Sequence, residues 1–531
     1  MLRGLNTLLG WGGRLQSTLA ASPSRYTRLQ SLNLHAPGLS VWDAIPASVD
    51  SVHDAASFQE AFGEYAKDQM PDTRVVLRGR VLAKRSASKK LYFVDVGSRY
   101  DAPDACLRVQ VMATKGGWEM DGVEFRDALE EVGRGDCVAV VGKPTRTQKG
   151  QLSLVPEQLL VEGPCLPPDD ALPLPGSVSR PETLASRPRA AHLLLVPDIV
   201  DAVRVRAGMY RSLRSRLDGD GFVEVETPVL GSAAGGAVAR PFATHHVASK
   251  SDKFLRIAPE LHLKQYVVGG LDQVYELGKV FRNEGIDLSH LPEFSMAELY
   301  STKLDLQGLM ALTQDLIRDF ADTASRSECL SPIGARVLET DAFEVVSYVD
   351  ALNAAMGEDL VLDADPDADD TLLRSQLGHH LQVADLVSKG EVEMASTASL
   401  LDKLGGHLVE DTLEGPAFLV GHPLILSPLA QADPSNPTVA QRFEVFVDGM
   451  EIANGYNEIT DPFVQLDRFQ AQSASSRGDV EVPTPDVTYC NALAYGMPST
   501  VGLGLGMDRI LMLLTRGGDA NIRSVVGFPD S

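Results

Sequence analysis

The sequence of 531 residues is short of cysteine, of positive charge and of long hydrophobic runs, and each shortage excludes a class of protein. Its 5 cysteines are scattered and form no C-x-x-C pair, which argues against a disulfide framework and a structural zinc site, and for a reducing compartment. The uncharged stretch Gly415–Ala430 contains prolines, a histidine and a serine, so it is not a membrane span, and we expect no membrane partner. Because 48 Lys and Arg residues stand against 72 Asp and Glu residues, the surface repels phosphate, and only a local basic patch could bind nucleic acid.

The first 42 residues contain no Asp or Glu, although four arginines are spread through Ser-, Thr- and Leu-rich sequence. Such a segment is typical of an organellar transit peptide. A secretory signal would need an unbroken apolar core, which the sequence Gly-Trp-Gly-Gly-Arg14 interrupts. The alternative is a disordered tail. We therefore expect residues 1–45 to lie outside the folded protein.

Two folded parts follow, and a proline-rich segment separates them. Residues 46–162 contain about five short β-prone segments between Arg74 and Val161, which favours a small β-barrel of the OB type, with a helix before it. Residues 163–189 read as a linker. From 190 to 531, helical patterns alternate with strands: we predict a helix over Ile199–Leu217, a strand over Phe222–Thr227 and a helix over Glu260–Val268.

The barrel segment carries a local positive island. Between Arg74 and Lys90 there are seven basic residues, Arg78 and Arg80 among them, and no acidic one. Two aromatic residues, Tyr92 and Phe93, follow on the next predicted strand. OB barrels bind single-stranded nucleic acid by combining a charged groove with aromatic stacking platforms. The alternative is a solvated strand face above core aromatics.

The most informative segment is Phe281–Phe294, where a strand over Val274–Phe281 enters a polar loop and returns as a second strand. The two-residue period of a strand places alternate side chains of the second strand on one face, with Arg282 and Glu284 arriving from the first. A guanidinium binds a phosphate and an aromatic ring stacks on a base, so this set predicts a nucleotide site. The face comprises Phe294, Met296, Glu298 and Tyr300.

A hairpin is predicted around the Asp448-Gly449 turn. Such a turn pairs Phe446 with Glu451 and Glu444 with Ala453. The carboxylates of Glu444 and Glu451 would then lie diagonally on one face, within reach of one hard cation. The alternative is a pair of ordinary surface charges, which the apolar strand context disfavours.

Beyond the hairpin, Asn454, Tyr456 and Glu458 share a strand face of opposite parity to Glu451. One β-bulge is needed to direct both sets into one cavity, and Gly455 is the expected position.

The segment Gly502–Arg509 alternates glycine with larger residues and then enters a helix. The small residues suggest a ligand close to the backbone, with Arg509 on its phosphate. Close packing of a strand on a helix would explain the glycines but not the charge.

These segments, preceded by Gly-Phe-Val-Glu-Val-Glu-Thr-Pro228, resemble motifs 1, 2 and 3 of class II aminoacyl-tRNA synthetases. Within that class, Arg256-Ile-Ala-Pro-Glu260-Leu, Phe281-Arg-Asn-Glu-Gly-Ile-Asp287 and Asn454-Gly-Tyr-Asn-Glu458 are similar to lysyl-tRNA synthetase rather than to its aspartyl and asparaginyl relatives. The resemblance covers Arg74 to Pro529. It implies an α+β fold in which an antiparallel sheet flanked by helices, residues 190–531, follows an OB-fold anticodon-binding domain. With the transit-like start, it implies a mitochondrial matrix enzyme.

The resemblance also implies roles for individual residues. The substrates would be L-lysine, ATP and tRNA(Lys), with Mg²⁺ as cofactor, in a homodimer formed through the motif 1 region. ATP would be bound by Arg282, Glu284, His290, Phe294 and Arg509, of which Arg282 and Arg509 are the catalytic residues. Lysine would be bound by Gly236, Glu260, Glu298, Tyr300, Asn454, Tyr456 and Glu458. Glu444 and Glu451 would hold the metal, and Phe93 (with Tyr92 as its rival), Gln110, Arg78 and Arg80 would meet the anticodon.

The acidic residues agree with this allocation, because a buried ammonium is tolerated only opposite a carboxylate. Three positions depart from the family pattern: Leu291, the segment Ser301–Lys303 and Ala494. None of them is an expected ligand. Two alternatives remain at this stage: a related ligase that modifies a protein, and a catalytically silent RNA-binding scaffold. The scaffold predicts loss of the catalytic arginines or of the metal carboxylates, and all four residues are present.

Overall fold

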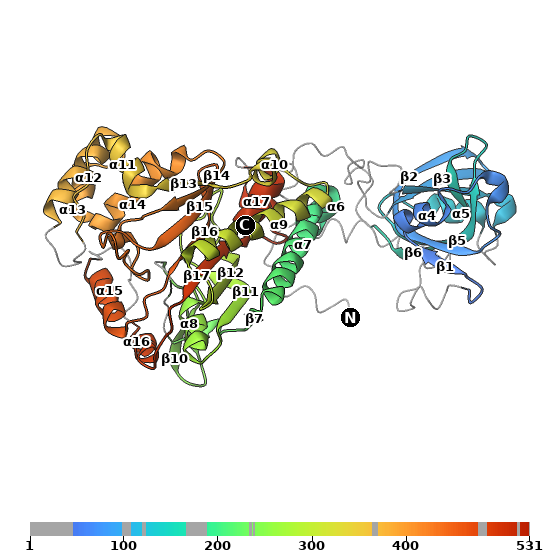
Figure 1. Ribbon diagram of the computed structural model, residues 1–531. Coiled ribbons are helices and arrows are strands. Elements are labelled where there is room, and N and C mark those ends of the chain that lie inside the picture. The colour runs from blue at the N-terminus through green and yellow to red at the C-terminus, as the bar shows by residue number, and fades with distance from the viewer. Residues whose placement is uncertain are drawn as a thin grey trace. The chain divides into compact units, whose positions relative to one another are not determined.

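The computed structural model describes residues 46–97, 108–118, 124–165, 188–232, 236, 239–363, 370–475, 486–517 and 521–529 (Figure 1). The predicted transit segment and most of the predicted linker lie outside these ranges. The chain divides into two compact units, Met1–Pro197 and Asp198–Ser531, which are described separately. None of the helices in the described ranges combines the length and the apolarity that a bilayer crossing requires.

Five strands of the first unit close into a barrel in the order β2-β3-β4-β6-β5, with β5 pairing back onto β2. The pairs are antiparallel except for β4 with β6, and a short strand β1 runs parallel to β2. This confirms the predicted OB-type barrel and the helix before it. The elements are β1 (Ser51–His53), α4 (Ala55–Phe62), η2 (Lys67–Gln69), β2 (Val75–Ser88), β3 (Leu91–Gly97), β4 (Arg108–Thr114), η4 (Lys115–Gly117), α5 (Phe125–Glu131), β5 (Cys137–Arg146), β6 (Leu152–Gly163) and α6 (Arg189–Leu195).

The interior of the barrel follows from strand alternation. In β3, Tyr92, Val94 and Val96 are buried, while the residues between them are half-buried on the other face. The ring of Tyr92 packs edge-on against Phe125 of α5, with the ring centroids 5.8 Å apart. The residues of β3 that point inward thus supply the barrel core, and the residues between them lie on the outer face of the barrel.

An eight-stranded sheet forms the centre of the second unit, in the order β13-β14-β15-β16-β17-β12-β11-β7 (Figure 1). Its six inner strands are antiparallel neighbours, whereas the edge strands β13 and β7 run parallel to theirs. The strands are β7 (Val223–Glu224), β11 (Gln273–Phe281), β12 (Glu293–Ser301), β13 (Glu344–Ser347), β14 (Pro416–Val420), β15 (Arg442–Val447), β16 (Met450–Asn457) and β17 (Val501–Gly506); β8 (Leu230–Gly231), β9 (Ala243–His246) and β10 (Ser251–Leu255) form a small separate sheet.

Helices cover the sheet and confirm the predicted α+β class. The helices are α7 (Pro197–Gly219), α8 (Glu260–Val268), α9 (Leu306–Arg326), α10 (Pro332–Glu339), α11 (Tyr348–Met356), α12 (Thr371–Val383), α13 (Lys389–Met394), α14 (Thr397–Leu408), α15 (Pro462–Ser475), α16 (Val487–Leu493) and α17 (Met507–Arg516), with short 3₁₀ turns η7 (Glu410–Thr412), η8 (Leu424–Leu426) and η9 (Ile522–Ser524).

The main core lies between one face of the sheet and the helices α7, α9 and α17. Leu213 of α7, Phe320 of α9 and Met512 of α17 are fully buried there, together with Leu503 and Leu505 of β17. Apolar residues spaced three or four apart place one stripe of each helix on the sheet. The helices α11, α12 and α14 build a second core against β14 and β15, at the other end of the sheet. The helices α7, α9 and α17 therefore leave the opposite face of the central strands uncovered.

The predicted helices agree closely with the structure, but one predicted strand does not. The helix predicted over Glu260–Val268 has those bounds, with Pro259 before it and Gly269 after it. The strand predicted over Phe222–Thr227 is wrong in length, because only Val223–Glu224 pairs with β11. The chain leaves the sheet there: the Thr227 hydroxyl instead donates to the Glu276 carboxylate at 2.7 Å.

A buried ion pair fastens α7 to the start of α17. The Asp508 side chain is 2% exposed; one of its oxygens contacts the Arg206 guanidinium, and the other accepts from the Ser295 backbone N–H at 2.7 Å. Three segments that are distant in the sequence thus meet on one carboxylate. Removing one partner of such a pair is costly, because the other charge stays buried without compensation.

The first prediction concerns this pair. Asp508→Ala is expected to destabilise the second unit by about 3–5 kcal/mol and to lower its midpoint of thermal unfolding by roughly 5 °C or more. The matched control is Asp322→Ala, which breaks the surface pair of Asp322 with Arg326. That change is expected to cost at most about 1 kcal/mol. Equal shifts for the two variants in a calorimetric scan would refute the role given to the buried pair.

Candidate active site

A cavity of about 470 Å³ opens on the sheet of the second unit, over β12, β15, β16 and β17. The four strands come from both ends of the unit's sequence, and the cavity lies on the face that the core helices leave uncovered. A concave site with converging polar groups is the usual form of a small-molecule site. The predicted residues that line it are Gly236, Glu260, Arg282, Glu284, His290, Phe294, Glu298, Tyr300, Glu444, Glu451, Asn454, Tyr456 and Arg509.

Strand alternation builds the floor of this cavity. In β17, Leu503 and Leu505 are buried in the core, whereas Gly502, Gly504 and Gly506 line the cavity. A Cβ atom at Gly502 would lie 2.1 Å from Glu458 Oε1, closer than real side chains approach. The absence of side chains at these glycines therefore leaves room on the cavity face for a ligand and for Glu458 close to the backbone of the strand, as the sequence suggested.

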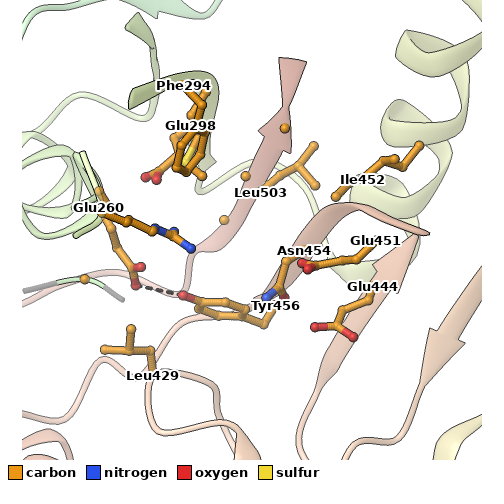
Figure 2. Close-up of a pocket in the computed structure, with 18 of the residues that line it drawn as sticks. Glu260, Phe294, Glu298, Leu429, Glu444, Glu451, Ile452, Asn454, Tyr456 and Leu503 are labelled. Atoms are coloured by element: carbon orange, nitrogen blue, oxygen red, sulfur yellow. Dashed lines mark hydrogen bonds between the residues drawn. The ribbon is translucent and has the colours of Figure 1, made fainter. Parts of the chain in front are cut away.

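Carboxyl groups gather at one end of the cavity. Glu260 begins α8, Glu298 lies on β12, and Glu458 follows β16; all three are buried. The Tyr456 hydroxyl donates to Glu260 Oε1 at 2.8 Å, as Figure 2 shows, and the Tyr300 hydroxyl donates to Glu298 Oε2 at 3.2 Å. Three acids brought together in this way predict a cationic ligand.

The protonation of these acids reflects their burial. Burial, followed by the charge of Glu260, raises the pKa of Glu298 to about 8. Burial also raises the pKa of Glu458 well above its usual range, although Lys264 opposes the rise. The acidic end is therefore an environment in which additional positive charge is favourable.

Lys264, which the sequence analysis missed, pairs with two of these acids. Its ammonium lies 2.6 Å from Glu260 Oε1 and contacts Glu458 Oε2, and its side chain is fully buried. The only available signal was its position, one helical turn after Glu260. A lysine at that spacing is normally a surface ion pair, so the pattern alone could not reveal a buried one.

Two arginines occupy the other end. The Arg282 guanidinium lies over the Phe294 ring, 5.3 Å from its centroid. Arg509 donates to His290 Nε2 at 2.7 Å and to the Glu451 carbonyl at 2.9 Å, while the other nitrogen of His290 lies 2.8 Å from Asp287. A flat cation stacked on an aromatic ring, with a second cation nearby, is suited to a nucleotide and its phosphates.

The carboxylates of Glu444 and Glu451 line the cavity beside these arginines (Figure 2). Burial disfavours the charge of Glu444, but Arg442 and His422 outweigh burial and lower its pKa to about 2. Burial and the charge of Glu444 raise the pKa of Glu451. A divalent cation would relieve that repulsion. Within the described ranges, no three His, Cys, Asp or Glu side chains cluster as a metal site. A metal ion held by Glu444 and Glu451 would therefore also need oxygen atoms from a bound molecule, such as phosphate oxygens.

Comparison with known proteins agrees with this geometry. Residues 182–531 match the family model for class II tRNA synthetases (D, K and N). The chain is 37% identical to the lysine–tRNA ligase cla4 of Cladosporium cladosporioides, covering 91% of this chain and 80% of that protein. It is 34% identical to the lysine–tRNA ligase of Enterococcus faecalis, covering 90% and 92%, and 34% identical to that of Lactococcus lactis, covering 94% and 96%. The chain belongs to the class II lysyl-tRNA synthetase family.

The position of the bulge is a correction to the sequence analysis. Phe446 pairs with Glu451 as predicted, but Glu444 pairs with Asn454 rather than Ala453, because the register shifts within the hairpin. The extra residue is Ile452, not Gly455. This bulge places Glu451 on the same face as Asn454 and Tyr456. Gly455 has another role: a Cβ there would lie 2.6 Å from the ring of Phe443.

Glu458 differs in position from the other predicted lysine-binding residues, all of which line the cavity. It is not among the residues that line the cavity. It is fully buried, and its Oε1 lies on the cavity face of β17, in the space that a side chain at Gly502 would fill. The remaining predicted residues converge as expected. Gly236 lies beside Glu260: its φ is +90°, a conformation that favours glycine, and a Cβ there would lie 3.1 Å from the Glu260 Cβ.

On the barrel, the four predicted anticodon residues fall into two groups. Phe93 is half-buried on the outer face, where its neighbour across β4 is Met112, and Gln110 lies on the same face opposite Asp95. Tyr92 is in the core and leaves Phe93 as the aromatic residue of that face.

The basic predicted residues are engaged in local contacts. Arg78 donates two hydrogen bonds to Glu162, at 2.7 and 2.9 Å, and Arg80 donates to the Gly135 carbonyl at 2.6 Å. The charge of Arg78 is thus balanced within the barrel, whereas Arg80 keeps its charge but is held by a backbone carbonyl.

The second prediction tests the glycine floor. Gly502→Ala would place a methyl group against Glu458 Oε1 and 2.5 Å from the Tyr300 ring, so one of them must move. The KM for the amino acid should rise at least about tenfold, which corresponds to about 1.4 kcal/mol, while the KM for ATP changes little.

The comparison variant is Gly504→Ala on the same strand, where the nearest atoms to a new Cβ are at 3.8 Å. Its effect on the amino-acid KM should be smaller. Equal effects of the two alanines in steady-state kinetics would contradict the close approach inferred at Gly502.

Proposed function

We propose that this protein joins L-lysine to tRNA(Lys) at the expense of ATP, through a lysyl-adenylate. The observation that carries the proposal is one cavity that brings the buried carboxyl groups of Glu260 and Glu298, with Glu458 beside them, together with the guanidiniums of Arg282 and Arg509. The names of its relatives support the same assignment. An aspartate pocket would instead present a cation to the substrate side chain.

Lysine is assigned to the acidic end. Its α-ammonium would meet Glu260, and its side-chain ammonium would meet Glu458 and Tyr300, with Glu298, Asn454 and Tyr456 completing the pocket. Two ammonium groups removed from water need carboxylates near both, and the arrangement of these acids supplies them.

ATP is assigned to the cationic end. Arg282 would hold the α-phosphate, Phe294 and Glu284 the adenine, and His290 with Arg509 the outer phosphates. Glu444 and Glu451 fit Mg²⁺, since hard cations prefer carboxylate oxygens and Mg²⁺ is commonly held by one or two carboxylates together with substrate phosphates. Bound there, the ion would neutralise charge on the phosphates.

The reaction follows from this placement. The lysine carboxylate attacks the α-phosphorus and pyrophosphate leaves; the terminal ribose hydroxyl of the tRNA then attacks the lysyl carbonyl, and AMP leaves. No protein nucleophile is required, because the residues act by positioning the reactants and by stabilising developing negative charge.

We further propose that the barrel binds the anticodon of tRNA(Lys). The outer-face pair of Phe93 and Gln110 supports this assignment, since an aromatic ring stacks on a base and an amide reads its edge. Arg78 and Arg80 would contribute less than the sequence suggested, because both are already engaged within the barrel.

A mitochondrial location and a homodimer are also part of the proposal. The acid-free, arginine-containing start of a chain of net charge −24 supports import into the matrix. The motif 1 region supports the dimer, because Val223, Val229 and Leu230 all leave more than a third of their surface exposed.

The third prediction is the test of the function. L-Lysine should support exchange of labelled pyrophosphate into ATP, whereas aspartate and asparagine should not. Arg282→Ala should reduce the exchange by at least about 100-fold, as expected for loss of a charge that stabilises the transition state. Absence of exchange with every amino acid would favour the silent scaffold. Labelled lysine that reaches a protein instead of tRNA(Lys) would favour the protein-modifying ligase.

The fourth prediction concerns pH. Since the pKa of Glu298 is about 8, the group is mostly protonated at pH 7 in the free enzyme. A bound ammonium favours the carboxylate, so lysine binding should release a proton, and the lysine KM should fall as pH rises from 6.5 to 8.

Below the pKa of Glu298, the lysine KM is expected to fall by up to tenfold for each unit that the pH rises. Above that pKa, the lysine KM should become independent of pH. Glu298→Gln should remove most of this dependence, because the amide does not titrate. A lysine KM that varies equally with pH in both proteins would assign the effect to another group.

A further inference from the structure

The buried ammonium of Lys264 is an unusual feature of the site, because a fixed cation stands inside a pocket proposed to receive a cationic substrate. Its Nζ lies 2.6 Å from Glu260 Oε1 and contacts Glu458 Oε2. Its side chain is 0% exposed, so no solvent shares its charge. The two carboxylates hold it from different elements, one on its own helix and one beyond β16.

Aromatic residues enclose the remaining sides of this ammonium. The ring centroids of Tyr300, Tyr456 and Tyr489 lie 5.9, 5.6 and 5.9 Å from Nζ. These rings, the two carboxylates and nearby Glu298 are the titratable groups around it. Such surroundings hold an ammonium in one place.

Glu458 is only half used by this contact. Its Oε2 meets Lys264, whereas its Oε1 is buried and has no hydrogen-bond partner among the described residues. A Cβ at Gly502 would lie 2.1 Å from that oxygen, and Gly502 lines the cavity. Because a side chain at Gly502 would point to the cavity face of β17, the unpaired oxygen lies on that face, in the space that the glycine leaves empty. A buried acceptor without a partner is costly, which indicates that a ligand supplies the missing donor.

We propose that Lys264 is a positioning and specificity-determining residue: it holds one oxygen of Glu458 and directs the other toward the side-chain ammonium of the amino-acid substrate. This inference rests on the proposed function and assigns a role to a residue outside the cavity lining. The carboxylate of Glu458 then lies between two ammonium groups, one from the protein and one from the substrate.

Charge balance gives this arrangement its selectivity. Three carboxyl groups surround one fixed ammonium, so two negative charges remain when all three are ionised. An amino acid with a cationic side chain brings two ammonium groups and matches that remainder. A neutral or acidic side chain supplies no second ammonium, so either an acid stays protonated, as Glu298 mostly is at pH 7, or its buried charge is left uncompensated.

The fifth prediction uses Lys264→Met, which keeps length and removes charge. Lys264 opposes the rise in the pKa of Glu458, so without the ammonium Glu458 should take up a proton, which lysine binding must then displace. The lysine KM should rise at least about tenfold at pH 7 and fall again at higher pH, since charge-assisted contacts are lost. The KM for ATP should stay within about twofold, because the guanidinium end is unchanged.

Three further variants separate a positioning role of Lys264 from a packing role. Lys303→Met removes an exposed lysine of the same unit, paired loosely with Asp272 at 3.9 Å, and should leave the lysine KM unchanged. Glu458→Gln alone should also raise the lysine KM at least about tenfold. The double variant Lys264→Met/Glu458→Gln should be no more than about threefold worse than Glu458→Gln, because both residues act through one contact.

The outcomes are distinct. If Lys264→Met folds and its lysine KM and pH profile equal those of the wild type, the inference is wrong and Lys264 serves packing alone. If Lys264→Met does not fold, the double variant decides, and a further tenfold loss beyond Glu458→Gln overturns the proposal. Absence of lysine-dependent exchange in the wild type would instead refute the proposed function, on which this inference rests.

Discussion

A carboxylate removed from water requires a positive charge beside it, and the second unit of this synthetase is organised around that requirement. Lys264 stands between Glu260 and Glu458 at one end of the cavity, and Arg442 with His422 holds Glu444 at the other. Two carboxylates share the single ammonium of Lys264, which leaves negative charge unmatched there, whereas Glu444 is matched by Arg442. The site is therefore acidic where a cationic amino acid is proposed to bind. Even so, Glu260, Glu458 and Glu444 each have a cation of the protein in contact with their carboxylate.

The central strands serve the core and the site at the same time. Leucines of β17 pack on the helices while its glycines form the cavity floor, and β12 divides its residues in the same way. Successive side chains of a strand point to opposite faces, so core residues and site residues are neighbours on the same backbone. A mutation in the core that shifts this backbone is therefore expected to displace the site residues. The bulge at Ile452 is the one departure from this alternation, and it brings Glu451 onto the face of Asn454 and Tyr456.

The barrel shows that a charge pattern does not determine what the charges do. Its strand β2 carries a run of basic residues in an acidic chain, which predicts a phosphate-binding face. In the structure, Arg74 and Arg78 meet Glu157 and Glu162 of β6, acids more than eighty residues away in the sequence. The outer face carries half-buried Phe93 and buried Gln110, the pair on which the proposed anticodon contact rests.

Local patterns in the sequence determined the elements and most of the site. The bounds of α8, the Asp448-Gly449 turn and the shared face of Phe294, Glu298 and Tyr300 all follow from helix signals, turn chemistry and strand period, which act over a few residues. Only the tertiary structure decided that Ile452 carries the bulge, that Glu458 is fully buried beside Gly502 and that Lys264 is buried between two acids. Those outcomes depend on which distant segments pack together, and burial converts an ordinary helical ion pair into the charge on which the pocket depends.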